Sequence, residues 1–313
     1  MSEPIKVLIA DDMSKKAVDL LTGAGFSVDF KVGMKPEELA AVVGQYHGLG
    51  IRSASKVTAA TLANPGKLKI IGRAGVGVDN IDVKVANEKG VLVINTPQGN
   101  AAAAAELAIG FVFALARKIP QAVESFKQGA WEKKKFMGVE VAGKTLGVIG
   151  LGNIGRNAAQ RGVGIGMNVI GYDPFPPKEV PAGVKLVSLD EIITKSDFVT
   201  LHVPLTDGTR NLFNAETLAK MKKGSYLINC ARGGIVDEAA LLGALQSGQL
   251  AGAALDVFSK EPPEASPLFQ HENFLGVPHL GASSKEAQEK VAIELAEVFI
   301  GFLKDGIVKN AVR

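Results

Sequence analysis

Cysteine, aromatic residues and long apolar stretches are all scarce in this sequence, and each scarcity excludes a class of protein. Cys230 is the single cysteine among 313 residues, so no disulfide can form within the chain and a reducing compartment is expected. No stretch is long and apolar enough to span a bilayer, and the apolar run near the N-terminus is too short for a signal sequence. These features predict a soluble, cytoplasmic protein that binds no membrane.

Excess charge and clustered histidines are also lacking. The formal net charge is +3, which is too small and too dispersed for a nucleic-acid-binding protein but is compatible with a small anionic ligand. The spacing of His47, His202 and His271 predicts no metal site. The 36 glycines are instead typical of an α/β protein with many tight turns, and 47% hydrophobic residues in a chain of this length favour two domains.

Apolar runs and helical periodicity alternate through the first third of the chain. Strands are predicted at 5–10, 26–30, 48–52, 68–73 and 91–94, and helices at 15–22, 36–45, 58–63 and 83–88. Alternation at this spacing predicts a parallel sheet with helices on its faces. Residues 1 to about 98 are therefore expected to form one α/β unit.

The same alternation returns after two helices. A long alanine-rich helix is predicted at 100–117, and Pro120 separates it from a second helix that ends near Gln128. Further strands are predicted at 145–149, 168–172, 185–187, 198–202, 225–229 and 251–257, and helices at 190–194, 215–220, 238–247 and 284–303. The second half is therefore expected to contain a second parallel sheet.

The stretch at 144–174 contains a dinucleotide-binding pattern. An apolar strand leads into GLGNIG at 150–155, which opens a helix, and a second apolar run ends at Asp173. Glycines at these three positions permit a tight turn, the approach of backbone N–H groups to a pyrophosphate, and close helix–strand packing. Asp173 can accept both ribose hydroxyls, and no arginine follows it to hold a 2′-phosphate. The predicted cofactor is therefore NAD and not NADP.

Three ionisable residues adjoin predicted elements in the second half. Arg232 follows the strand 225–229, Glu261 follows the strand 251–257, and His279 precedes the final helix. A guanidinium can fork onto a carboxylate or ketone oxygen, and a carboxylate beside a histidine fixes its tautomer, so the three form an acid–base set. Taken singly, His279 is more simply interpreted as a satisfied loop histidine, and Glu261 before two prolines is compatible with an ordinary turn acid.

Several motifs together resemble the D-2-hydroxyacid dehydrogenase family over essentially the whole chain. They are GRAGVGVD at 72–79, the glycine loop with Asp173, NCARGGIVD at 229–237, ALDVF at 254–258, EPP at 261–263 and PHLGAS at 278–283. WEKKKFMG at 131–138 and NTPQGN at 95–100 are most similar to the members that oxidise a phosphorylated 2-hydroxy acid.

The resemblance implies roles for individual residues. His279 would be the catalytic acid–base, Glu261 its partner, and Arg232 the anchor for the substrate carboxylate and carbonyl. Asp256 would face the nicotinamide carboxamide of NAD. The implied cofactor-binding residues are Gly150, Gly152, Asn153, Ile154, Gly155, Asp173, His202, Pro204, Thr209, Cys230, Ala231, Asp256 and Gly281.

A second set of residues is implied for the substrate. The loop 74–77 would offer backbone N–H groups to the carboxylate, while Arg52, Asn100 and the lysines of 133–135 would reach a phosphate, Lys133 from a neighbouring subunit. For any single lysine of that run, a solvated surface is an equally good interpretation. The implied substrate-binding residues are Arg52, Ser53, Ala74, Gly75, Val76, Gly77, Asn100 and Lys133.

The resemblance also implies an architecture of two Rossmann-like/flavodoxin-like parallel-sheet domains, with the cofactor domain inserted into a discontinuous substrate domain. Residues 1–98 and 286–313 would bind the substrate, and 99–285 would bind NAD. A homodimer or homotetramer is expected. Some family members continue into regulatory domains, whereas this sequence stops at Arg313 as a natural short form or a truncated one, so no feedback control is expected from this polypeptide.

Two other functions remain open at this point. A sister reductase acting on glyoxylate or hydroxypyruvate would share the scaffold and the three ionisable residues, and only the phosphate-binding residues would differ. Relatives of the family also act as NADH-sensing corepressors, in which the fold serves as a protein-binding module. The intact acid–base set favours an enzyme.

Overall fold

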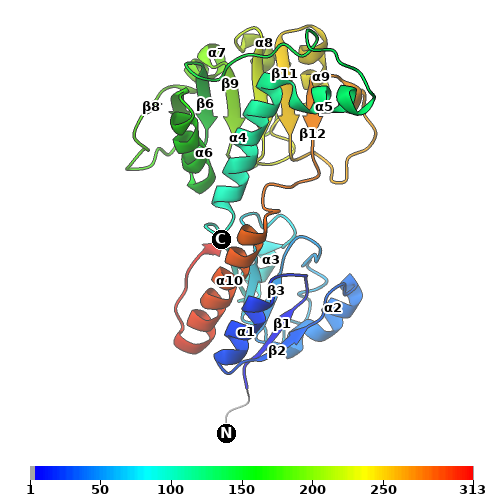
Figure 1. The fold of residues 1–313 in the computed structure, drawn as a ribbon. Helices are drawn as coiled ribbons and strands as arrows, with labels where there is room; N and C mark the ends of the chain where they lie inside the picture. The colour runs from blue at the N-terminus through cyan, green and yellow to red at the C-terminus, as the bar shows by residue number, and fades with distance from the viewer. Residues whose placement is uncertain (1–3, 313) are drawn as a thin grey trace. The chain divides into compact units, whose positions relative to one another are not determined.

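The computed structural model describes residues 4–312, which divide into two compact units (Figure 1). The first unit comprises Met1–Ala101 and Ala282–Arg313, and the second comprises Ala102–Gly281. Each unit is a parallel sheet with helices on both faces, so the predicted pair of α/β domains is confirmed. Among the residues described, no helix combines the length and apolarity that a membrane crossing requires.

The sheet of the first unit has six strands in the order β13-β5-β4-β3-β1-β2. Five are parallel, and β13 pairs antiparallel with β5 at the edge. This is the doubly-wound order 2-1-3-4-5, whose reversal lies between β1 and β3. The strands are β1 (Lys6–Ile9), β2 (Ser27–Phe30), β3 (Gly48–Ile51), β4 (Ile70–Arg73), β5 (Leu92–Asn95) and β13 (Ala311–Val312).

Two pairs of helices cover this first sheet. Strand residues alternate between its faces, so Ile70 packs toward α1 and α10 while Ile71 packs toward α2 and α3. Burial on both faces explains why the strands are almost continuously apolar. The helices are α1 (Lys15–Gly23), α2 (Pro36–Val42), α3 (Val83–Glu88) and α10 (Lys285–Asp305), and the 3₁₀ turn η1 (Val43–Gln45) follows α2.

The sheet of the second unit has seven parallel strands in the order β12-β11-β10-β9-β6-β7-β8. Renumbered from β6, this is the dinucleotide-binding order 3-2-1-4-5-6 with one added strand, and the reversal lies between β6 and β9. The strands are β6 (Thr145–Ile149), β7 (Asn168–Tyr172), β8 (Val184–Leu186), β9 (Phe198–Leu201), β10 (Ser225–Asn229), β11 (Leu250–Leu255) and β12 (Phe274–Gly276).

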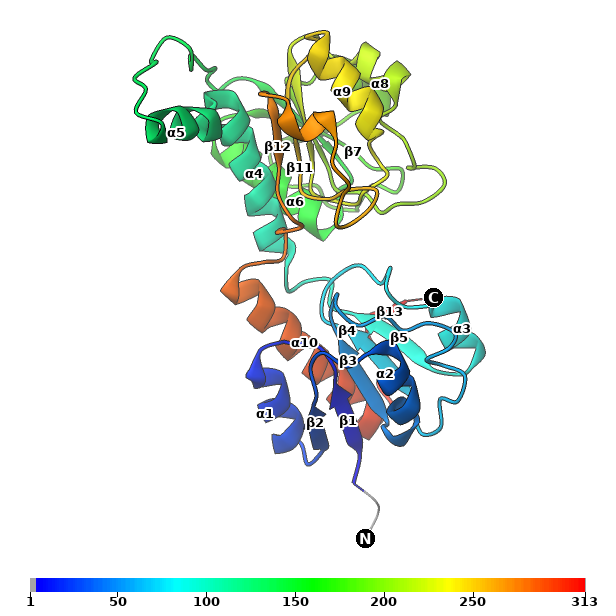
Figure 2. The same cartoon turned by 90° about the vertical axis from the view of Figure 1, so that its right-hand side faces the viewer.

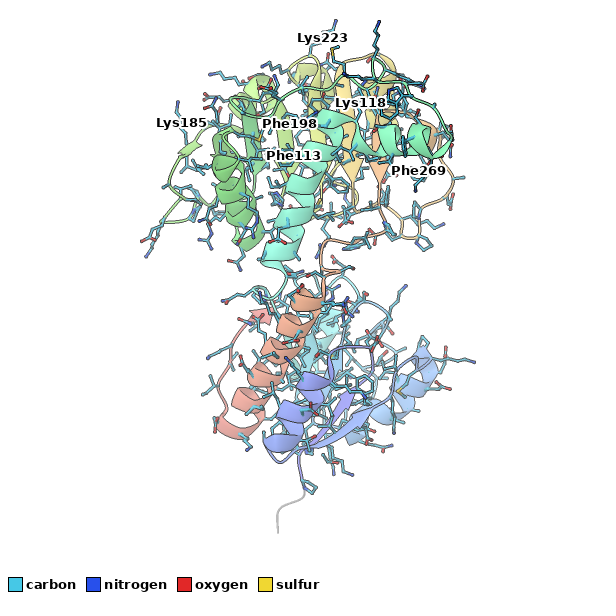
Figure 3. All side chains as sticks on the ribbon, in the orientation of Figure 1. Phe113, Lys118, Lys185, Phe198, Lys223 and Phe269 are labelled. Carbon is cyan, nitrogen blue, oxygen red and sulfur yellow. The ribbon has the colours of Figure 1, made fainter. Side chains whose placement is uncertain are left out.

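Helices again cover both faces of the second sheet. The core against α4 and α6 contains Phe198, whose ring stacks on Tyr226 at 4.5 Å; Figure 3 shows Phe198 within the sheet and Lys185 and Lys223 at its periphery. The core on the other face packs against α7, α8 and α9. The helices are α4 (Ala101–Arg117), α5 (Ile119–Lys127), α6 (Asn153–Gly164), α7 (Leu189–Lys195), α8 (Ala215–Lys220) and α9 (Glu238–Gln246), and η2 (Pro267–Gln270) precedes β12.

The predicted helix at 58–63 is wrong, because this stretch forms turns. The N–H of Leu62 donates to the carbonyl oxygen of Thr58 at 3.1 Å in a single turn, and Asn64-Pro65 prevents its continuation as a helix. Strands β12 and β13 were not predicted, since each is too short to show an apolar period.

Candidate active site

The site residues predicted in the second unit follow the carboxyl ends of adjacent strands. In spatial order along the sheet, His279 follows β12, Asp256 and Glu261 follow β11, and Cys230 to Arg232 follow β10. His202, Pro204 and Thr209 follow β9, the glycine loop follows β6, and Asp173 follows β7. The crevice of an open α/β sheet lies at this edge, and the glycine loop and His202 flank the reversal between β6 and β9.

The three glycines of the loop meet different surroundings. Gly150 has φ +92°, and a Cβ there would lie 2.5 Å from the carbonyl oxygen of His202. A Cβ on Gly155 would lie 1.8 Å from the carbonyl oxygen of Gly150, so only glycine permits this contact between helix and strand. A Cβ on Gly152 would meet nothing within 4 Å. Open space above Gly152, at the N-terminus of α6 where Asn153 and Ile154 begin the helix, fits a pyrophosphate.

Asp173 holds the glycine loop. Its Oδ2 accepts the N–H of Leu151 at 2.7 Å, and its Oδ1 accepts the N–H of Phe175 at 2.8 Å. Each oxygen retains a second lone pair, so the carboxylate can still accept a ribose hydroxyl. The Arg156 guanidinium donates to Asn153 Oδ1 at 3.1 Å, which places a cation on the first turn of α6.

His202 lies in a partly closed environment at the end of β9. Its Nε2 lies 3.0 Å from the Thr200 hydroxyl, while its Nδ1 is buried and lacks a hydrogen-bond partner within residues 4–312. Burial lowers the pKa of His202 to about 4, so the ring is neutral at physiological pH. Farther along the loop, the Thr209 hydroxyl donates to the carbonyl oxygen of Pro204 at 2.6 Å and closes a tight turn.

The structure brings His279 and Glu261 together. His279 Nδ1 lies 2.7 Å from Glu261 Oε2, and Glu261 Oε1 accepts the N–H of Phe258 at 3.1 Å. The His279 side chain is exposed, and its Nε2 has no hydrogen-bond partner among the described residues, so this nitrogen can exchange a proton with a ligand. His279 also has φ +53°, a left-handed conformation that is uncommon outside glycine and points to a functional constraint.

Asp256 holds the backbone around His279. It is fully buried, and its two oxygens accept the N–H groups of Leu280 at 2.5 Å and Gly281 at 2.8 Å. Its carbonyl oxygen accepts the N–H of His279 at 2.9 Å. Burial raises the pKa of Asp256, and the two N–H donors oppose that rise. Burial, and secondarily the charge of Asp256, also raises the pKa of Cys230 well above its usual value, so this thiol, which packs in the core of the second unit, is a poor nucleophile.

Arg232 is positioned by Asn229, which the sequence interpretation missed. Asn229 is buried at the end of β10, where its side chain donates to the carbonyl oxygen of Arg232 at 2.9 Å and accepts the N–H of Ala231 at 3.0 Å. The Arg232 guanidinium donates to the carbonyl oxygen of Ala231 at 2.7 Å. A Cβ on Gly233 would lie 1.8 Å from the carbonyl oxygen of Phe258, so the loops carrying Arg232 and Glu261 touch.

The loop at 74–77 in the first unit offers fewer donors than its sequence suggests. The N–H of Ala74 donates to the carbonyl oxygen of Ile51 at 2.8 Å, and that of Gly75 donates to the Thr96 hydroxyl at 2.7 Å. Within the described part of the chain, the N–H groups of Val76 and Gly77 have no partner. These two groups are therefore the ones available to an anion.

The residues implied in phosphate binding lie apart along the chain. Arg52 follows β3 and donates from Nη1 to the carbonyl oxygen of Asp12 at 3.0 Å, and Ser53 beside it is exposed. Asn100 is buried, and its Oδ1 has no partner in the described structure. Lys133 is exposed in the loop after α5. Residues 4–312 contain no cluster of histidine, cysteine and acidic side chains that could hold a metal ion.

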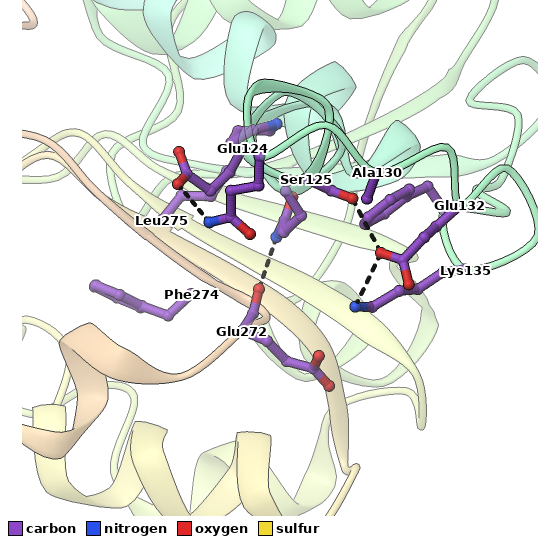
Figure 4. A pocket seen from close by; sticks show the side chains of 12 residues that line it. Glu124, Ser125, Ala130, Glu132, Lys135, Glu272, Phe274 and Leu275 are labelled. Carbon is purple, nitrogen blue, oxygen red and sulfur yellow. Dashed lines mark hydrogen bonds and ion pairs between the residues drawn. The ribbon is translucent and has the colours of Figure 1, made fainter.

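A hollow of about 420 Å³ lies elsewhere on the second unit (Figure 4). It is bounded by α5, the loop after α5 and β12, and its lining includes Lys135 of the predicted 133–135 run. Gln121 donates to the carbonyl oxygen of Glu272 at 2.7 Å across it, and Ser125 donates to Glu132 at 3.0 Å.

Comparisons with known proteins identify the family. Residues 109–281 match the D-isomer specific 2-hydroxyacid dehydrogenase, NAD binding domain. The chain is 52% identical over 310 residues to D-3-phosphoglycerate dehydrogenase of Homo sapiens, covering 98% of this chain and 58% of that protein. It is 46% identical over 312 residues to the D-3-phosphoglycerate dehydrogenase of Methanocaldococcus jannaschii, covering 99% and 59%. The chain thus spans less than two thirds of the length of these relatives.

A solved structure extends the likeness over the complete chain. The TT0316 protein from Thermus thermophilus superposes with a TM-score of 0.90 at 33% identity, covering 99% of this chain and 100% of that one. The predicted resemblance and the predicted NAD cofactor are confirmed by these matches. The chain belongs to the D-isomer-specific 2-hydroxyacid dehydrogenase family, and residues 109–281 are its NAD-binding domain.

Proposed function

We propose that this protein oxidises D-3-phosphoglycerate to 3-phosphohydroxypyruvate with NAD, the first step of phosphorylated serine biosynthesis. The observation that carries the proposal is the 2.7 Å contact between His279 and Glu261, in a chain 46–52% identical to D-3-phosphoglycerate dehydrogenases over nearly its whole length. Arg232 lies on a loop that touches the loop of Glu261. We propose both the substrate and the direction of the reaction.

In the proposed mechanism, His279 Nε2 takes the proton of the substrate hydroxyl. Glu261 holds Nδ1 protonated, so Nε2 is the basic nitrogen, and it stabilises the imidazolium that forms. Arg232 binds the substrate carboxylate and stabilises charge on the developing carbonyl oxygen. The glycine loop at 150–155 would hold NAD, which would supply the acceptor for the hydride of C2. One proton and one hydride leave the alcohol, which becomes the ketone.

We assign the two ends of the substrate to different loops of the first unit. The free N–H groups of Val76 and Gly77 suit the carboxylate. Arg52, Ser53, Asn100 and a lysine of the 133–135 run are assigned to the phosphate. Asn100 Oδ1, which is buried without a partner in the described structure, supports a polar ligand at that residue.

The test is NADH formation with D-3-phosphoglycerate beside D-glycerate, each with NAD and with NADP. Strong preference for the phosphorylated acid and NAD is expected. Activity confined to D-glycerate would transfer the protein to the glyoxylate and hydroxypyruvate reductases. No turnover with either acid, with NADH still bound, would favour an NADH-sensing binding protein.

We further propose that the protein is a cytoplasmic homodimer built around α5 and the loop that follows it. Figure 2 shows α5 and this loop projecting from the second unit. Large apolar side chains there are exposed, and the rings of Phe126 and Trp131 face each other at 6.3 Å. They are Ile119 (47%), Val123 (47%), Phe126 (65%), Trp131 (84%) and Met137 (79%). Exposed apolar side chains gathered on one helix and its loop are typical of an interface, and the hollow beside them offers a recess for a second copy.

A further inference from the structure

The two central loops of the first unit are held by residues that follow the flanking strands. In the order β5-β4-β3-β1, the loops after β3 and β4 carry the residues assigned to the substrate. Asp11 comes two residues after β1, and Asn95 and Thr96 come at the end of β5. Neither Asp11 nor Thr96 is among the residues assigned to the substrate or the cofactor, although both are buried.

Asp11 uses its carboxylate entirely on the loop at 52–55. Oδ2 accepts the N–H of Arg52 at 2.6 Å and the N–H of Ser55 at 3.1 Å, while Oδ1 accepts the Ser55 hydroxyl at 2.6 Å. Asp11 is only 2% exposed and lies where the sheet order reverses between β1 and β3. Ligands of open α/β sheets bind outside such a reversal, so this carboxylate shapes a ligand-binding edge.

Asn80 closes the same loop from the other side. Its Nδ2 donates to the carbonyl oxygens of Arg52 and Ser55, both at 2.7 Å. Two side chains from different segments therefore bind both ends of the loop. Asp11 accepts the N–H groups of Arg52 and Ser55, and Asn80 donates to their carbonyl oxygens. Arg52 in turn contacts the carbonyl oxygen of Asp12, which orients its guanidinium.

The loop after β4 is held in a similar way. The Thr96 hydroxyl accepts the N–H of Gly75 at 2.7 Å, and the carbonyl oxygen of Gly75 accepts the N–H of Thr96 at 3.0 Å. Asn95 Nδ2 donates to the carbonyl oxygen of Val76 at 2.6 Å. These contacts leave the N–H groups of Val76 and Gly77 pointing to no protein partner in the described chain.

We propose that Asp11 and Asn80 are positioning residues for the phosphate end of the substrate, and that Thr96 is a positioning residue for the carboxylate end. The proposal rests on the proposed function. Its physical basis is preorganisation: a loop held in its binding conformation loses less conformational freedom when the ligand binds. We call the contacts of Asp11 and Asn80 with the loop at 52–55 one clamp, and the contact of Thr96 with Gly75 the other. Each clamp therefore affects the affinity for one end of the substrate more than the rate of the chemical step.

The experiment compares Asp11→Ala and Asn80→Ala with the wild-type enzyme on D-3-phosphoglycerate and D-glycerate. Loss of a buried hydrogen-bonding partner is expected to raise KM for the phosphorylated acid by about tenfold. KM for D-glycerate, kcat for both acids and the Kd for NADH stay within about twofold, since the clamp lies outside the NAD-binding domain. The preference for the phosphorylated acid falls accordingly.

Conservative variants separate positioning from charge. Asp11→Asn is expected to restore the preference, because the amide oxygen can accept the two N–H groups while the amide N–H₂ donates to the Ser55 hydroxyl. Ser55→Ala removes the hydroxyl contact alone and is expected to raise the same KM by about threefold, which keeps the test informative if Asp11→Ala folds poorly.

Thr96→Val is expected to affect both acids, whereas the Asp11 and Asn80 variants affect only the phosphorylated acid. It deprives the Gly75 N–H of its acceptor and is expected to raise KM for both acids by about tenfold, with Thr96→Ser restoring the wild-type values. The control is Asp29→Ala, which removes an acid that accepts the Tyr46 hydroxyl at 2.5 Å on β2 of the same unit. Its kinetics should match the wild type.

Three outcomes would overturn the inference. If the wild-type enzyme prefers D-3-phosphoglycerate and Asp11→Ala and Ser55→Ala keep that preference undiminished, the clamp has no role in positioning. If Asp11→Ala lowers kcat for both acids equally, the role is structural only. If the wild-type enzyme shows no preference for the phosphorylated acid, the proposed function fails, and the inference fails with it.

Discussion

His279 combines three unusual features at one residue. It has a left-handed backbone, an exposed ring, and a carboxylate 2.7 Å from Nδ1. A loop histidine whose role is only structural needs none of these. Asp256 holds the backbone on either side of the ring, so the buried carboxylate stabilises the left-handed turn that carries the base.

Replacing His279 with Ala is expected to lower kcat by a factor of about 10² to 10⁴ while the Kd for NADH stays within about threefold, because the ring is the general base of the proposed mechanism. Glu261→Gln should lower kcat less, since the tautomer is weakened but the ring remains. Steady-state kinetics and NADH fluorescence titration measure both quantities. His271→Ala is the matched control and should behave as the wild type. Near-normal turnover of His279→Ala would remove this residue from the mechanism.

His202 gives the stability a pH dependence of known sign. Its folded-state pKa of about 4 lies below the ordinary value of 6.5, so the unfolded chain binds more protons between these values. The contribution is present above pH 6.5 and is lost as the pH falls toward 4. From pH 7 to pH 5 the loss is about 2 kcal/mol of unfolding free energy.

Urea unfolding of the wild type and of His202→Gln at the two pH values measures this loss. The wild type should lose about 2 kcal/mol more than the variant on going from pH 7 to pH 5. All other titrating groups are shared, so they cancel in the comparison. Parallel losses in the two proteins would show that His202 titrates normally in the fold.

At the scale of elements, the glycines between β6 and α6 serve two different purposes: one is required by the fold and another by the cofactor. A Cβ on Gly155 collides with the backbone of Gly150, whereas a Cβ on Gly152 enters open space. Gly155 is needed because helix α6 packs closely on strand β6. Gly152 is needed only when a ligand occupies the space above the loop.

Gly152→Ala is therefore expected to leave the melting temperature within a few degrees and to weaken NADH binding by about tenfold or more. Gly155→Ala is expected to lower the melting temperature itself, because backbone must move. Gly164→Ala on the same helix also meets nothing within 4 Å and serves as the control, with wild-type binding and stability. Wild-type NADH affinity in Gly152→Ala would place the pyrophosphate elsewhere.

At the scale of the whole molecule, the exposed apolar residues of α5 and its loop are the feature that a monomer leaves unexplained. Trp131→Glu places a charge in the proposed interface and is expected to convert the dimer to a monomer, because burying an unpaired carboxylate is costly. Light scattering after gel filtration measures the mass. Val32→Glu, at a 50% exposed apolar residue of the first unit, is the control and should remain dimeric. A wild-type monomer would refute the interface.

The sequence by itself determined the repeating strand–helix order and the glycine loop with Asp173. It also predicted that Arg232, Glu261 and His279 form an acid–base set. These depend on local patterns: apolar periods, glycines at set spacing, and ionisable residues next to elements. The stretch 58–63 shows the limit even at short range, because the turn closed by the Leu62 N–H and the Thr58 carbonyl oxygen ends at Asn64-Pro65 and does not grow into a helix.

Only the tertiary structure decided which donors and acceptors meet across the sheet. Asp11 and Ser55 are 44 residues apart, and Gly75 and Thr96 are 21 apart, so no local pattern links them. Strand order determines these pairs, since neighbouring loops in a parallel sheet come from distant parts of the chain. The same reason explains why Ala74 and Gly75, which resemble free anion-binding donors in the sequence, are already paired in the fold, whereas Val76 and Gly77 remain available.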